Sequence, residues 1–280
     1  MRRTIPASLL GCVLLAQDAS AQEAMYTAAA TMPSPHTGVV REQFHYYRFG
    51  SNPNDASTET DVYELTSSLA YGLTRGLALF VDVPVEFENE HAPAGSPDGG
   101  WDKGVADIDA MFKYRFYKND TGGVDTLRAA LMAGASFASG DDHDFSSKSI
   151  NPHAGVVATW VKGRHGLNGE FHFYWNTGGT LKSNLGGEGP SDALRLNASY
   201  LYRIYPAAYT ADSKGAWYIT SELNYLYETT ADHDLRFSPG LMFEGWKYAF
   251  EIMAQLPLYQ EVDHRPEMKF GIGVGIRIAF

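Results

Sequence analysis

The segment EMKFGIGVGIRIAF (267–280) alternates strictly between two kinds of side chain. A period of two residues is that of a β-strand, in which successive side chains point to opposite faces. One face carries charged residues, glycine and alanine. The other is apolar throughout and consists of Met268, Phe270, Ile272, Val274, Ile276, Ile278 and Phe280. So long an apolar face is unusual for a half-buried strand of a soluble protein, so the pattern predicts a strand in contact with an apolar medium.

The same alternation recurs along most of the chain. Most of the alternating segments have 11–15 residues, and a tilted strand needs about 9–11 residues to cross a bilayer. The segments are 39–50, 60–73, 77–89, 105–118, 124–138, 149–161, 167–177, 193–205, 216–228, 234–244, 248–260 and 267–280. We therefore expect about twelve strands, each long enough to cross a membrane.

The connections between these segments alternate in length. After the second, fourth, sixth, eighth and tenth segments they are mostly short, for example TRG (74–76) and KGRHG (162–166). After the first, third, fifth and seventh segments they are long and polar, for example HAPAGSPDGGWDKG (91–104). Short turns on one rim and long loops on the other, with an even number of strands, are typical of outer-membrane barrels.

The faces expected to point outward on the third to twelfth segments contain no Asp, Glu, Lys or Arg. They carry residues such as Leu79, Leu131, Phe173 and Leu256. A charge facing lipid at the membrane midplane costs about 2–4 kcal/mol, and only a closed sheet pairs the backbone of membrane strands. The sequence therefore predicts an all-β fold, a transmembrane antiparallel up-and-down β-barrel of about twelve strands. A soluble secreted β-protein is the alternative, and it predicts recovery without detergent.

Residues 1–21 have the features of a cleaved secretory signal peptide. Arg2 and Arg3 precede a short apolar core, and Ala19-Ser20-Ala21 forms a small-x-small cleavage site. A lipoprotein cleavage box at 9–12 is the alternative, although the apolar run continues beyond it. We therefore expect export, and the barrel pattern places the protein in the outer membrane of a Gram-negative bacterium.

Residues 22–38 lack periodicity and precede the barrel, which we expect to span residues 39–280. This N-terminal segment could hang in the periplasm or enter the lumen as a plug. Gly271, Gly273 and Gly275 fall on the inward face of their strand and would leave room for such a plug.

Composition excludes several classes of function. The formal net charge of −11 argues against nucleic acid as a partner, because a phosphate-binding protein needs a basic face. The only cysteine, Cys12, lies in the expected signal peptide, so the mature chain would form no disulfide. No motif of a known catalytic or phosphate-binding site occurs, and we expect neither enzymatic activity nor a cofactor. A hydrolase site of Ser146 or Ser147 with His143 is conceivable, but ordinary loop composition explains these residues.

A twelve-stranded barrel falls between eight strands, which side chains fill, and sixteen, which leave an open channel. We expect a narrow lumen lined by charges of both signs and by aromatic residues, including Tyr205 and Tyr259. The candidate pore-lining residues are Asp82, Glu86, Asp107, Asp109, Lys113, Arg115, Arg128, Glu170, Tyr174, Arg195, Arg203, Glu222, Arg236, Glu251, Lys269 and Arg277.

The segment VADIDAMFKYRFYKND (105–120) separates the two signs along one inward face. Asp107 and Asp109 come first, Lys113 and Arg115 follow, and Tyr117 continues the same face. With a chain that starts in the periplasm, the acids lie toward the outer mouth and the bases toward the periplasm. One interpretation is that other lumen charges neutralise these groups and stiffen the barrel. The other is a constriction that selects solutes by charge and shape.

Four loop tips carry a histidine beside an acid, at 90–91, 141–144, 232–234 and 263–264. Histidine with carboxylate suits a divalent metal. Solvated polar loops explain the same composition, and we expect no metal site.

The segment GIRIAF (275–280) resembles the assembly signal of bacterial outer-membrane barrels, with Gly275, Ile278 and Phe280 matching it. This resemblance implies recognition by the barrel assembly machinery. The other partners we expect are outer-membrane lipid, lipopolysaccharide and a small-molecule solute, and we expect the barrel to be a monomer.

The segment GVADIDAMFKYRFYKNDTGGVDTLRAALMAGASFASGDD (104–142) resembles the core of a family of outer-membrane barrels associated with meta-pathway phenol degradation. The resemblance extends over about residues 39–280 and implies a transporter, with aromatic or hydrophobic compounds as substrates. Ala138 departs from the pattern, since the family often has proline there. The matching residues are Asp107, Ile108, Lys113, Tyr114, Arg115, Phe116, Gly140 and Asp141.

The sequence thus favours a channel for passive uptake of small molecules. The competing hypothesis is a structural or adhesive outer-membrane barrel, whose lumen is closed by charge networks and whose long loops bind partners.

Overall fold

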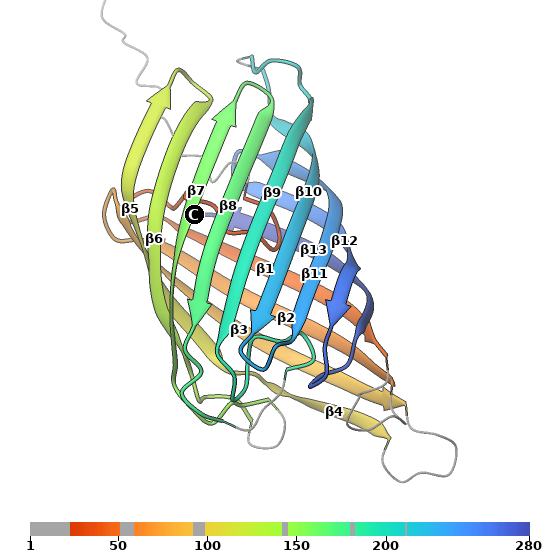
Figure 1. Ribbon diagram of the computed structural model, residues 1–280. Coiled ribbons are helices and arrows are strands. Elements are labelled where there is room, and N and C mark those ends of the chain that lie inside the picture. The colour runs from red at the N-terminus through yellow and green to blue at the C-terminus, as the bar shows by residue number, and fades with distance from the viewer. Residues whose placement is uncertain (1–22, 51–58, 92–98, 142–144, 180–182, 211) are drawn as a thin grey trace, which may run out of the picture.

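The computed structural model of the protein is a closed antiparallel β-barrel (Figure 1). It describes residues 23–50, 59–91, 99–141, 145–179, 183–210 and 212–280, and the expected signal peptide lies outside them. No helix among these residues is long and apolar enough to cross a membrane. The strands are β1 (Gly38–Phe49), β2 (Glu59–Gly72), β3 (Leu77–His91), β4 (Gly100–Val105), β5 (Ile108–Thr121), β6 (Asp125–Phe137), β7 (Asn151–Lys162), β8 (His165–Tyr174), β9 (Ala193–Tyr205), β10 (Gly215–Glu228), β11 (His233–Gly245), β12 (Tyr248–Glu261) and β13 (Met268–Ala279). The predicted fold class is confirmed.

Strands β4 and β5 together form one stave of the barrel, because both pair with β3. The sequence predicted one continuous strand over 105–118, but the stave begins at Gly100 and is interrupted at Asp107. The carboxylate of Asp107 accepts hydrogen bonds from the backbone N–H groups of Ser139, Gly140 and Ser147, which stabilises the interruption. Counted as staves, the barrel has the twelve that the alternation predicts.

The sheet closes where β1 pairs with β13. The N–H of Gly38 donates to the carbonyl oxygen of Phe280, and the N–H of Phe280 donates to that of Gly38, each at 2.9 Å. The short turns lie at one rim, at the top of Figure 1, and the long loops lie at the opposite rim. The pairing of β1 with β13 closes the sheet on itself, so the strands that cross the membrane have their backbone groups paired, as a lipid environment requires.

An apolar belt covers the outside of the barrel. The exposed fractions of Leu131, Phe250 and Ile252 are 51%, 50% and 52%. Trp160 and Trp217 are also exposed and lie near the short-turn rim, where an interfacial aromatic girdle is expected. The hydrophobic effect would oppose this exposure in water, so the belt indicates a lipid-facing surface.

Register shifts change which face some residues occupy. Tyr117, Tyr205 and Tyr259 were expected inside, but each follows or precedes an extra residue in its strand and is exposed at 43%, 66% and 52%. A fourth shift, between β1 and β13, turns Met268 inward, where it is 2% exposed, and leaves Lys269 exposed. A bulge inserts one residue and reverses the alternation beyond it, so these inward assignments were wrong.

Candidate functional site

Residues 23–35, here called the lumenal segment, run through the inside of the barrel. The segment is the coil drawn in red within the barrel in Figure 1, and it forms no strand. Most of its side chains are buried, with Ala24 at 2% and both Ala29 and Ala30 at 0% exposure. Of the two positions that the sequence left open, the structure has this segment in the lumen.

One side of the barrel wall holds the beginning of the lumenal segment. The carboxylate of Glu222 on β10 accepts the backbone N–H groups of Met25 and Tyr26 at 3.0 and 3.2 Å. The guanidinium of Arg41 on β1 donates to the carbonyl oxygen of Ala24 at 3.1 Å. The lumenal segment forms no strand, so these side chains supply hydrogen-bond partners for its buried backbone groups.

The opposite wall holds the middle of the segment through three strands. The N–H of Ala28 donates to Glu170 on β8 at 3.1 Å, and the N–H of Ala30 donates to Thr159 on β7 at 2.8 Å. The ammonium of Lys113 on β5, 1% exposed, donates to the carbonyl oxygen of Ala29 at 2.9 Å and lies over the ring of Phe80. Several candidate pore-lining charges therefore bond the backbone of the lumenal segment.

Two inward glycines leave room beside this segment. A Cβ on Gly273 would lie 2.5 Å from the sulfur of Met25, and one on Gly275 would lie 2.7 Å from the carboxylate of Glu251. Glu251 in turn pairs with Arg41 at 2.6 Å, and Arg277 pairs with Glu23 at 3.4 Å. The small face of β13 thus makes room for both the segment and the charges around it.

A chain of polar groups follows the wall across β5, β7 and β8. The carboxylate of Asp109 contacts Nε2 of His153 at 2.8 Å, and Nδ1 of His153 contacts Nε2 of His172 at 2.7 Å. His172 then contacts Glu170 at 3.3 Å. The ring of Tyr174 stacks on both imidazoles, and the guanidinium of Arg195 lies 4.7 Å from the centre of the Tyr174 ring.

Two other candidate pore-lining acids face acids on neighbouring strands. The register places Asp82 opposite Asp109 and Glu86 opposite Glu64. Like charges on neighbouring strands are unfavourable unless other groups compensate them. Asp109 has such a partner in His153, and the carboxylate of Glu64 lies 3.4 Å from His45.

Three of the candidate pore-lining bases bond groups at the short-turn rim. Arg115 donates to the carbonyl oxygen of Arg75 at 2.6 Å, Arg128 pairs with Asp120 at 3.2 Å, and Arg203 donates to the carbonyl oxygen of Gly163 at 3.1 Å. Lys113, which the sequence also places toward the periplasm, bonds the lumenal segment. Arg115 on β5 and Arg128 on β6 lie on adjacent strands, within two residues of each other in the register.

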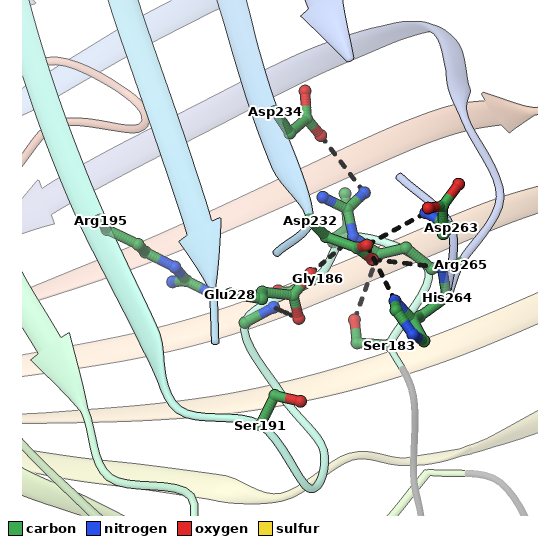
Figure 2. Close-up of polar contacts among 12 residues, drawn as sticks. Ser183, Gly186, Ser191, Arg195, Glu228, Asp232, Asp234, Asp263, His264 and Arg265 are labelled. Atoms are coloured by element: carbon green, nitrogen blue, oxygen red, sulfur yellow. Dashed lines mark hydrogen bonds and ion pairs between the residues drawn. The ribbon is translucent and has the colours of Figure 1, made fainter. Parts of the chain in front are cut away.

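The long-loop rim holds a compact cluster of paired charges (Figure 2), here called the rim cluster. Arg265 pairs with Glu228 at 3.0 Å and with Asp234 at 3.3 Å, and Arg236 also pairs with Asp234. Glu228 accepts the N–H of Gly187 at 3.0 Å, which ties the β8–β9 loop to this rim. Arg265 and Glu228 were not among the candidate residues, because a single charge beside a strand end is the only signal that the sequence carries for them.

The acid–histidine loop tips do not form a metal site in the part of the chain that the structure describes. His91 contacts Asp61 at 2.7 Å, and His264 contacts Asp232 at 2.9 Å, so these histidines have separate carboxylate partners. The tip at 142–144 lies outside the described residues. Ser147, considered for a hydrolase, donates its hydroxyl to Asp107 and helps to hold the β6–β7 loop.

The lumen contains a cavity of about 160 Å³. It lies between Tyr26 of the lumenal segment, Leu185 of the β8–β9 loop and strands β9 to β12. Arg195 and Arg236 are the two candidate pore-lining cations that line it. The barrel is therefore not completely filled by its wall and by the lumenal segment.

No protein-family model matches the chain, and no curated protein matches it. Among solved structures, an outer-membrane channel from Pseudomonas putida F1 has a TM-score of 0.58 and 14% identity, over 92% of this chain and 99% of its own. The β-domain of the Bordetella autotransporter BrkA has a TM-score of 0.50 and 13% identity, over 87% and 100%. These likenesses concern the fold, which is that of outer-membrane β-barrels. One neighbour is a channel and the other an autotransporter domain, so the fold alone leaves the function open.

Proposed function

We propose that the protein is an outer-membrane channel for passive uptake of small molecules, with aromatic or hydrophobic compounds as its substrates. The observation that supports this most directly is the cavity in the lumen, beside a segment that belongs to no sheet. Wall side chains, rather than strand pairing, hold that segment at Met25, Tyr26, Ala28 and Ala30. Such contacts can open one at a time, so the segment can move without breaking the barrel.

The substrate class rests on separate support. The resemblance of residues 104–142 to the phenol-degradation family favours aromatic or hydrophobic solutes. Aromatic side chains in the lumen, including Tyr26 of the lumenal segment, Tyr47 and Tyr174, offer surfaces on which such solutes can pack. In this proposal the barrel works as a monomer in lipid and lipopolysaccharide, and the assembly machinery reads Gly275, Ile278 and Phe280.

The competing function is a structural or adhesive barrel with a closed lumen. The rim cluster favours it, because Arg265 and Glu228 fix the loops of the outer mouth. A closed barrel and a channel make different predictions about the lumenal segment. In a channel the segment controls the path, whereas in a closed barrel its removal affects mainly stability.

Planar-bilayer conductance of the full chain and of a variant lacking residues 24–33 tests the proposal. We expect the wild type to conduct weakly and the deletion to conduct at least severalfold more. Arg75→Gln at a short turn serves as the control and should match the wild type. Arg115→Ala and Arg128→Ala should have smaller effects than the deletion, because their side chains bond groups at the short-turn rim.

Liposome flux of phenol and of a sugar of similar size completes the test. Heat-dependent gel mobility shows whether each variant has folded as a barrel. A folded deletion variant that neither conducts nor transports either solute would refute the channel and favour the closed barrel.

A further inference from the structure

The cavity in the lumen has the volume of a small ligand. Its volume of about 160 Å³ is close to the roughly 150 Å³ of an apolar cavity that holds one benzene molecule in another protein. Tyr26, Tyr47, Leu185 and Leu226 contribute aromatic and aliphatic surface to the lining. Size and lining together suit a single six-membered ring.

The charge of the lining favours an anion. Arg195 and Arg236 stand against one acid, Asp234, so the lining itself carries one excess positive charge. The carboxylates of Glu170, Glu188 and Glu228 act on Arg195 from farther away and reduce this excess. Arg236 is already paired with Asp234, but no carboxylate of the described residues forms an ion pair with Arg195. Figure 2 shows Arg195 reaching from β9 toward the loop that carries Gly186.

The hydrogen bonds of Arg195 leave much of its capacity unused. It donates to the hydroxyl of Tyr174 at 3.5 Å and to the carbonyl oxygen of Gly186 at 3.4 Å, both near the upper limit for a hydrogen bond. A guanidinium has five N–H groups in a planar fork that matches a carboxylate. A ligand carboxylate would therefore find donors at Arg195 without displacing an acid that is directly paired with it.

Two acceptors in the same lining lack a donor. Gln255 is 3% exposed and Asp234 is fully buried, and neither Gln255 Oε1 nor Asp234 Oδ1 has a hydrogen-bond partner. Buried acceptors without donors are unfavourable, and a ligand hydroxyl could satisfy one of them. The lining thus offers donors at Arg195 and acceptors at Gln255 and Asp234.

From this arrangement we propose that the cavity binds a single-ring aromatic carboxylate that also carries a hydroxyl group. The carboxylate pairs with Arg195, the ring packs among Tyr26, Tyr47 and Leu226, and the hydroxyl donates to Oε1 of Gln255. The inference rests on the proposed function, since it names the substrate class of the same lumen.

Calorimetric titration of the full chain in detergent with 4-hydroxybenzoate tests the site. 4-Hydroxybenzyl alcohol, which lacks the carboxylate, should bind at least tenfold more weakly, because it forms no charge-assisted bond with Arg195. Benzoate, which lacks the hydroxyl, should bind about threefold more weakly. Absence of measurable binding of 4-hydroxybenzoate to folded wild type would overturn the proposal.

Substitutions locate the binding. Arg195→Gln should weaken 4-hydroxybenzoate binding at least tenfold and leave the alcohol nearly unaffected, while the control Arg75→Gln leaves both unchanged. Gln255→Leu should weaken 4-hydroxybenzoate about threefold and leave benzoate unchanged. If Arg195→Gln does not fold, as judged by gel mobility, the affinity of Gln255→Leu for 4-hydroxybenzoate still tests the assignment. Equal affinities for 4-hydroxybenzoate in Arg195→Gln and Arg75→Gln, or in Gln255→Leu and wild type, would refute the assignment.

The outcome is separable from that of the channel experiments. A protein that transports phenol but does not bind 4-hydroxybenzoate keeps its proposed function and loses this site. A protein that binds 4-hydroxybenzoate through Arg195 but passes no solute keeps the site and loses the channel function.

Discussion

Charged side chains serve different purposes in the lumen wall and in the rim cluster. In the wall, Glu222, Glu170 and Lys113 bond the backbone of the lumenal segment. In the rim cluster, Arg265 and its carboxylate partners bond one another and so fix the loops. Buried charges in these two regions therefore have different roles, since those of the wall hold a separable segment and those of the rim cluster fix the loops of one mouth. Removing a charge from the wall leaves backbone groups of the lumenal segment without a partner. Removing one from the rim cluster leaves a buried charge without its counter-ion.

The largest effect is expected from Arg265→Ala. The substitution leaves the buried carboxylates of Glu228 and Asp234 without their shared cation, and breaking a buried ion pair costs about 3–5 kcal/mol. Urea unfolding in detergent micelles measures the loss, with exposed Arg75→Ala as the control, for which we expect a change under about 0.5 kcal/mol. A loss below about 1 kcal/mol would show that the rim cluster does not lock the mouth.

A smaller and different effect is expected from Glu222→Ala. It removes the acceptor of the Met25 and Tyr26 N–H groups, which should weaken local protection by about 2 kcal/mol, or about thirtyfold in hydrogen exchange. Glu222→Gln, which keeps one acceptor, should show a smaller rise. Barrel unfolding should change less than with Arg265→Ala. The reverse pattern, lost barrel stability with unchanged exchange at Met25, would contradict a separable segment.

Two threonines of the wall provide a matched test of how the wall holds the lumenal segment. Thr159 and Thr220 are both buried in the wall, but Thr159 accepts the N–H of Ala30, whereas the hydroxyl of Thr220 has no partner. Thr159→Val should raise exchange at Ala30 about fivefold, equivalent to about 1 kcal/mol. Thr220→Val should leave it unchanged, and equal effects of the two substitutions would show that the bond to Ala30 does not hold the segment.

The smallest effect concerns pH at the loop rim. Burial alone would raise the pKa of Asp232, but hydrogen bonds from the N–H of Asp263 and from His264 lower it below the ordinary value. The stabilisation from ionised Asp232 is therefore present above about pH 4 and is lost as the pH falls through the lowered pKa.

Amide chemical shifts of Asp263 and His264, followed by NMR from about pH 6 downward, should show this titration with a midpoint below about 4. Asp232→Asn should abolish it. A midpoint above about 4 would mean that these contacts do not stabilise the ionised carboxylate.

The strands could be predicted from the sequence because lipid exposure imposes a strict pattern. One charged residue on the outer face is costly, so Leu131, Phe250 and Ile252 mark their strands unambiguously. The bulges could not be predicted in this way. A single extra residue, as before Tyr117 and Tyr205, reverses the inward assignment without altering the local composition.

The candidate site was predicted only in part. Glu170, Glu222 and Lys113 were found because they occupy inward positions, but their partners lie 84 to 197 residues away in a segment without periodicity. The one signal for those contacts was the small inward face of β13. Gly273 has no room for a side chain because Met25 and Tyr26 occupy that space.

The pairing of β1 with β13 also constrains how the protein can be built. β1 directly follows the lumenal segment, and it forms the seam with the strand farthest from it in sequence. Once Gly38 and Phe280 have paired, residues 23–35 cannot pass sideways through the wall. These residues must lie inside before β1 pairs with β13, or they must enter through one end of the barrel afterwards. If the seam closes first, the barrel is at first empty. If the segment enters first, the barrel closes around it.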